Sequence, residues 1–297
     1  MWKVHRSALM ICLVVGCGSK PGSNIPGGPS GVLTSEAIQV FDEEDAADLF
    51  SDSVDYPTGT GSPEFGIIAQ VTSSASSNLL SPFQAFLEAP RTLSQPFQLC
   101  VPSTSGNITD GDADNVPISA DLTYQCPLSS GLLPPLVGSV HIEDDDDQIP
   151  RPQAGFLIKT NALTIEQSTK KINIKGFIDV DVTPANRTFV ANLSVISLLQ
   201  NGNSREFNIW IKTIVTPADA SNPRASGLVS FENSYLGIKA ATINVVVAIS
   251  SENLTYDHTC AKRFKNGKIT LTDGAGNVLQ LIFQNCQVTR LLNGNPV

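Results

Sequence analysis

The fold is decided by the stretch Lys171-Ile-Asn-Ile-Lys-Gly-Phe-Ile-Asp-Val-Asp-Val182. Branched apolar residues stand at alternate positions, with charged or amide residues between them. Successive side chains of a β-strand point to opposite faces of the sheet, so this period of two predicts a long, half-buried antiparallel strand. A kink is expected at Gly176. The apolar face would carry Ile172, Ile174, Ile178, Val180 and Val182, and the wet face Lys171, Asn173, Lys175, Asp179 and Asp181.

The same alternation recurs further along the chain. It starts again at Phe189 and at Phe207. Residues 269–283 are predicted to form a hairpin, because two alternating runs flank the Gly-rich turn Asp273-Gly-Ala-Gly-Asn277. About ten strands are expected in all. We therefore expect residues 100–292 to form one antiparallel β domain.

The preceding residues 33–99 have a different character. Residues 34–50 are predicted to form a short acidic helix and residues 81–93 another, with a Gly/Pro/Ser/Thr-rich loop at residues 57–63. A sheet with one wet face must cover its apolar face. The prediction is a mainly β fold: a large antiparallel sheet, curved or half-open as a barrel or sandwich. One or two short N-terminal helices would pack on it.

The N-terminus has the order of a secretory signal. A short basic region at residues 1–6 precedes an apolar run at residues 8–15, which is too short to span a membrane. Residues 1–16 are therefore predicted to be a signal peptide. Residues 17–32 are mostly Gly, Ser, Pro and Asn. That composition is typical of a flexible tether and cannot pack a core.

The end of the signal, Val14-Val15-Gly16-Cys17, resembles the lipobox of bacterial lipoproteins. The resemblance implies that Cys17 is acylated, with palmitate among the acyl chains, and becomes the first residue of a membrane-anchored protein. Several acyl chains together anchor a protein stably. In the family's sorting rule an Asp after the cysteine retains the protein at the inner membrane. Gly18 stands there, which favours the outer membrane of a bacterial envelope.

Charge and cysteine usage agree with an exported chain. The net charge is −9, and removal of residues 1–16 makes it more negative, which argues against nucleic acid and anionic lipid surfaces as partners. Without Cys12 and Cys17, an even number of cysteines remains. The favoured disulfides are Cys100–Cys126 and Cys260–Cys286, because the two pairs are equally spaced; the other connectivities stay open. No CxxC or Cys/His pair of zinc type occurs.

An Asp-rich segment begins shortly after the first of these cysteines. It places carboxylates at positions 1, 3, 5 and 12 of a calcium-loop pattern, and calcium prefers several converging oxygens. These residues are Asp110, Asp112, Asp114 and Asp121. Asn115, Pro117 and the short side chain of Asp121 depart from the pattern, and a solvated acidic turn is the alternative. Residues 143–150 are a second acidic stretch, with the same two interpretations.

Catalysis finds little support in the sequence. His141 and His258 remain after signal cleavage, and neither lies in a GxSxG, HExxH or P-loop motif. A non-enzymatic protein is expected; a hydrolase with converging carboxylates is the alternative. Trp210 and Tyr235 would suit a binding face. Trp210 falls on the polar side of its strand, for which a covered or edge aromatic is the plainer interpretation.

Two resemblances bear on function. The segments Leu254-Thr-Tyr-Asp-His-Thr-Cys260 and Phe283-Gln-Asn-Cys286, with the Asp-rich run at residues 110–126, resemble uncharacterised β-rich bacterial envelope lipoproteins, a family that brings no known activity. A half-open barrel would resemble the lipid-carrier lipoproteins. The expected function is a structural or interaction role in the envelope, with an envelope protein as partner. The alternative is a carrier of a lipid or other apolar ligand.

Overall fold

The computed structural model describes most of the chain after residue 102. The described residues are 28–43, 48–58, 103–109, 111–112, 116–125, 136–146, 148–149, 153–166 and 170–297. Two short helices, α1 (Ser35–Glu43) and α2 (Asp48–Thr58), precede fourteen strands. The predicted mainly β class with short N-terminal helices is confirmed.

All fourteen strands belong to one antiparallel sheet. In the first half of the sheet they are β1 (Ser103–Asn107), β2 (Ser119–Gln125), β3 (Leu136–Asp144), β4 (Phe156–Glu166), β5 (Lys170–Val182), β6 (Arg187–Leu199) and β7 (Ser204–Pro217). In the second half they are β8 (Ser226–Phe231), β9 (Ser234–Lys239), β10 (Asn244–Asp257), β11 (Phe264–Thr272), β12 (Val278–Gln284), β13 (Gln287–Leu292) and β14 (Asn295–Pro296). The sequence underestimated the number of strands, because short strands such as β1 and β14 show no alternation.

The strands follow one another as a meander, with a single irregularity between β7 and β10. There β8 and β9 both lie between β7 and β10. β8 pairs with the end of β7, and β9 with its beginning. Serine side chains bridge the break between them, since Ser234 Oγ accepts from the amide of Lys212 at 2.9 Å and Ser251 Oγ from that of Phe231 at 3.0 Å. The break therefore leaves the sheet continuous from β7 to β10.

The long strand that decides the fold lies where the sequence placed it. β5 buries Ile172, Ile174, Ile178 and Val180 on one face. Gly176, where a kink was expected, has a φ of +125°, and a Cβ there would stand 1.9 Å from the carbonyl oxygen of Asn192 on the next strand. Only glycine allows the two backbones to approach so closely.

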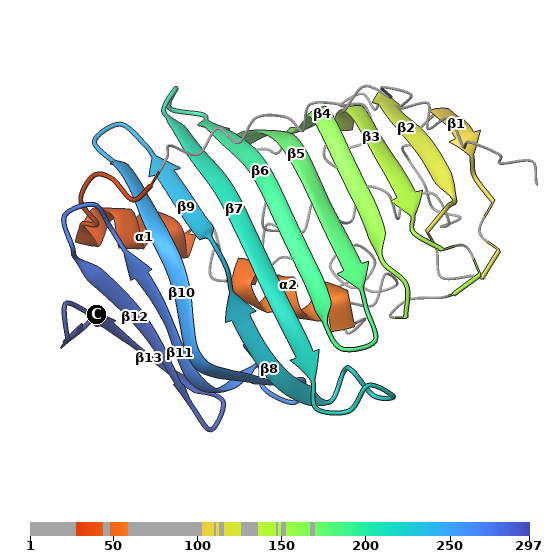
Figure 1. Ribbon diagram of the computed structural model, residues 1–297. Coiled ribbons are helices and arrows are strands. Elements are labelled where there is room, and N and C mark those ends of the chain that lie inside the picture. Colours follow the sequence, from red (N-terminus) through yellow and green to blue (C-terminus); the bar gives the residue numbers. More distant parts are fainter. Residues whose placement is uncertain are drawn as a thin grey trace, which may run out of the picture.

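The helices differ from the prediction in their bounds. The single helix expected over residues 34–50 is two helices, α1 and α2, and α2 continues through Pro57 to Thr58, where a loop was expected. The helix expected over residues 81–93 lies outside the described residues. Figure 1 shows β2 to β7 side by side, with α2 behind β6 and β7 and α1 behind β10. The core lies between these layers: apolar residues of both helices form one buried cluster with one face of the sheet.

Candidate functional site

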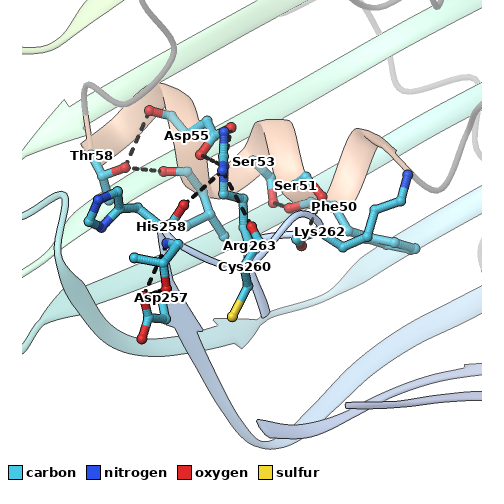
Figure 2. A network of polar contacts seen from close by, with 12 residues as sticks. Phe50, Ser51, Ser53, Asp55, Thr58, Asp257, His258, Cys260, Lys262 and Arg263 are labelled. Carbon is cyan, nitrogen blue, oxygen red and sulfur yellow. Dashed lines mark hydrogen bonds and ion pairs between the residues drawn. The ribbon is translucent and has the colours of Figure 1, made fainter. Parts of the chain in front are cut away.

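Helix α2 is held against the sheet by a polar junction at the end of β10 (Figure 2). Arg263 reaches from the turn between β10 and β11 to α2, where its Nε donates to both carboxylate oxygens of Asp55, at 2.8 and 2.9 Å. Its Nη1 donates to the carbonyl oxygen of His258 at 2.9 Å, which fixes the guanidinium to its own turn. Ser51 of α2 also donates to the carbonyl oxygen of Lys262 at 3.0 Å. The helix is thus fastened to a turn far away in the sequence.

The turn itself is stapled. The predicted disulfide Cys260–Cys286 is present and joins it to the hairpin of β12 and β13. Asp257 accepts from the amide and hydroxyl of Thr259 and from Lys265, and these hydrogen bonds hold the pKa of Asp257 at about 2. Because Cys260 is oxidised, it offers no thiolate beside His258. We call this junction, with its disulfide and its hydrogen bonds to α2, the clamp.

Helix α1 is fastened at the other end of the same face. Arg290 of β13 donates to the carboxylate of Asp42, and Thr242 to that of Glu36 at 2.9 Å. Just before α1, Ser30 exchanges two backbone hydrogen bonds with Val246 of β10, both 2.9 Å long. The two helices thus cover part of the apolar face of the sheet, and each has its own side-chain attachments.

Burial and the ion pair have opposite effects on the pKa of the carboxylate in the clamp. Burial raises the pKa of Asp55, and the hydrogen bond and charge of Arg263 oppose that rise. The Asp55 side chain is only 14% exposed, and that of Arg263 29%. A carboxylate so enclosed depends on its guanidinium partner, which makes this pair an important polar attachment of α2.

The opposite, wet face of the sheet carries an unbroken row of directly paired residues. The pairings run from β2 to β9, and each residue lies on the face opposite the core. We call this set the cross-strand row: Asp121, His141, Lys159, Phe177, Asn192, Trp210 and Tyr235. Strands lie about 4.8 Å apart, so the row spans about 29 Å across the sheet.

One end of the row is polar. His141 Nδ1 lies 2.9 Å from Asp121 Oδ1, and its Nε2 lies 3.6 Å from Glu143 Oε2. The side chain of His141 is 31% exposed and that of Asp121 60%. Lys159, the next residue of the row, is exposed. This end offers solvent-facing donors and acceptors next to one another.

The other end of the row is aromatic. Trp210 and Tyr235 are partners on neighbouring strands, both half-buried, and Asn192 pairs with Trp210 on its other side. Phe177, one strand further on, is 7% exposed, so little of its side chain reaches the surface. Trp210 therefore stands in the middle of a wide sheet, which corrects its interpretation as an edge aromatic. Phe177 was not assigned to either face from the sequence, and only its alternation with Ile178 and Val180 could have placed it.

The predicted calcium ligands are only partly within the described residues. Asp112 lies at a bend, whereas Asp121 lies on β2 and faces His141. Asp110 and Asp114 lie outside the described residues, as do Cys17, Cys100 and Cys126. Among the residues that the structure describes, no group of three or more His, Cys, Asp or Glu side chains could hold a metal ion. The calcium site stays a prediction.

The chain matches no family model, no curated protein and no solved structure. No described helix has both the length and the apolar character needed to cross a bilayer. The functional argument therefore rests on the two faces of the sheet.

Proposed function

We propose that this chain is a lipid-anchored protein of the bacterial envelope with a structural or interaction role, which displays the wet face of its sheet to a partner. The observation that carries the proposal is the fastening of α1 and α2 on the apolar face by Asp42–Arg290 and Asp55–Arg263. The apolar face of the sheet, on which these helices pack, forms the buried core. The partner-facing surface is then the opposite face, which carries the cross-strand row.

The N-terminal connection supports this arrangement. Ser30 is hydrogen-bonded to Val246, so the chain is attached to the sheet thirteen residues after Cys17. Thirteen residues reach at most about 45 Å. Acylation of Cys17 would hold the β9–β10 end of the sheet within that distance of a membrane, which limits the partners to molecules near that membrane.

The lipid-carrier alternative requires an apolar surface that a ligand could line. The sheet residues that would contact such a ligand belong to the buried core. Examples are Leu122, Leu163, Ile174 and Ile211, all 0% exposed. Helix α2 packs on β5, β6 and β7, in the middle of that face. These observations favour the interaction role over the carrier.

The anchor is tested by metabolic labelling with an alkyne analogue of palmitate. The full chain and its Cys12→Ala variant are expected to take up label, and Cys17→Ala is expected to lose it. Cys12 is the matched control, because it lies in the same signal segment. Label retained in Cys17→Ala would contradict the proposal.

The interaction role is tested by native mass spectrometry of the detergent-released chain. The native and denatured masses are expected to agree, with only the covalent lipid present. An additional lipid mass that disappears on denaturation would instead support the carrier.

A further inference from the structure

The cross-strand row combines side chains that recognise opposite parts of one kind of molecule. Trp210 and Tyr235 offer rigid, amphipathic surfaces, and such side chains lose little conformational entropy on binding. Asn192 both donates and accepts hydrogen bonds, and Asp121 accepts them. The row therefore suits a ligand that is apolar on its broad faces and rich in hydroxyl groups at its edges. A pyranose ring has this character.

The charge of the row argues against other ligand classes. Asp121 and Glu143 flank His141, and the chain as a whole carries a net charge of −9. A polyanion such as a nucleic acid would be repelled by this surface. An acyl chain lying on the row would exclude water from Asn192 and Lys159 without offering them hydrogen bonds, which is unfavourable. A neutral ligand that bears hydroxyl groups avoids both the charge repulsion and the loss of hydrogen bonds.

The shape of the surface indicates how such a ligand lies. The row crosses seven strands in register, from Asp121 on β2 to Tyr235 on β9, with one residue per strand, of which Phe177 is buried. An extended chain laid perpendicular to the strands meets a new side chain every 4.8 Å or so. β-1,4-linked sugars form flat, extended ribbons of this kind, whereas α-linked chains coil.

We propose that the cross-strand row binds an extended β-1,4-linked glycan, with sugar rings on Trp210 and Tyr235 and hydroxyl groups bonded by Asn192, Lys159 and the Asp121–His141 pair. The inference rests on the proposed function, since it names the partner class for the same wet face. A glycan bound along an open face gains contacts with each added sugar. Long chains therefore bind more tightly than short ones.

The chain carries a built-in reporter for this site. Its two tryptophans are Trp2, in the predicted signal peptide, and Trp210, so after removal of residues 1–16, or with Trp2→Phe where they are retained, all indole fluorescence comes from the row. Chitohexaose is titrated into this chain while the emission is recorded, and the affinity is measured in parallel by calorimetry. Cellohexaose and chitobiose are titrated in the same way.

The expected result is a saturable change in Trp210 emission with chitohexaose, and binding at least about tenfold weaker with chitobiose or after Trp210→Ala. Asn192→Ala weakens binding by less than Trp210→Ala. Leu198→Ala is the matched control, because Leu198 lies on β6 with Asn192 and is exposed on the same face, away from the row. It leaves the affinity unchanged.

Two results would overturn the inference. One is the absence of any saturable response to chitohexaose and cellohexaose, as expected if the row meets a protein instead. The other is unchanged binding by Trp210→Ala, with thermal unfolding confirming that the variant is folded. Neither experiment depends on Cys17. A failure here is therefore distinguishable from loss of palmitate labelling, which would contradict the anchor alone.

Discussion

The two faces of the central strands are built from the same backbone and obey different constraints. Along β6 and β7, burial alternates residue by residue between the helix-covered face and the wet face. Phe189 and Ile211 on the covered face are 0% exposed, whereas their neighbours Val190 and Lys212 are half-buried. Packing dictates the covered face, where a change of volume disturbs the neighbours. On the wet face only strand pairing decides which residues meet, so that face is free to carry a binding site.

Polar groups follow the same division. On the covered side, the hydroxyl of Tyr256 donates to the carbonyl oxygen of Pro223 at 2.5 Å, and burial raises the pKa of Tyr256 to about 12. On the wet side, the ion pair Lys212–Glu232 has both side chains more than a third exposed. Buried polar groups need their partners, and exposed ones can exchange them for water. Substitutions on the two faces should therefore differ in kind.

The largest contrast is expected between two isoleucines of β7. Ile211→Ala removes a side chain that is 0% exposed and should lower the free energy of unfolding by about 4 kcal/mol. Ile214→Ala, on the wet face of the same strand, should cost about 1 kcal/mol or less, because water fills the space. Urea unfolding measures both. Equal costs would mean that the wet face is also a packed core.

Loss of the disulfide comes next in size. Cys260→Ala with Cys286→Ala opens a loop with a sequence separation of 26, which should cost about 3.5 kcal/mol through the entropy of the unfolded chain. Reduction of the unchanged chain should cost at least as much, because it would also open the predicted disulfide Cys100–Cys126. A chain that unfolds at the same urea concentration with and without reductant would show that this staple adds nothing to stability.

The sequence was sufficient for everything that depends on alternation. The period of two at residues 171–182 identified the covered face of β5, and the turn Asp273–Asn277 located the β11–β12 hairpin. Equal spacing identified Cys260–Cys286. These signals are local, or depend on a simple count, so they can be read before any contact is known.

Contacts between distant segments could not be predicted in this way. The cross-strand row depends on the register of seven strands, and a single bulge, such as that between Ser139 and His141 on β3, changes which residues pair. The clamp joins Asp55 to Arg263, 208 residues further along the chain. The division of residues 34–50 into two helices was missed because loosely spaced apolar residues suggested one continuous face. Each of these features is decided by packing that no local pattern records.

A smaller contrast in stability is expected between two ion pairs, Arg263–Asp55 on the covered face and Lys212–Glu232 on the wet face. Arg263→Ala leaves the enclosed carboxylate of Asp55 without its guanidinium and should lower the free energy of unfolding by about 2 kcal/mol. The dye ANS should also bind more strongly as α2 loosens. Lys212→Ala breaks the exposed pair with Glu232 and should cost less than about 1 kcal/mol. A similar loss in both variants would show that Arg263 does not hold α2 in place.

The smallest effect concerns pH and the turn that holds the clamp. The pKa of Asp257 is about 2 in the folded chain, chiefly because the Thr259 hydroxyl and Lys265 bond its carboxylate, against an ordinary value of 3.8. The unfolded chain therefore takes up the proton first as the pH falls. The stabilisation by Asp257 is complete above about pH 4 and is lost progressively as the pH falls towards 2.

Thermal unfolding between pH 5 and 2 measures this loss in the unchanged chain, in Asp257→Asn and in Thr259→Ala. Asp257→Asn should flatten the fall in melting temperature, because it removes the titrating group. Thr259→Ala should flatten it in part, because the pKa of Asp257 then lies closer to its ordinary value. Profiles that are parallel in all three chains would assign the acid sensitivity to other carboxylates. The clamp turn would then hold α2 through Arg263 and the disulfide alone.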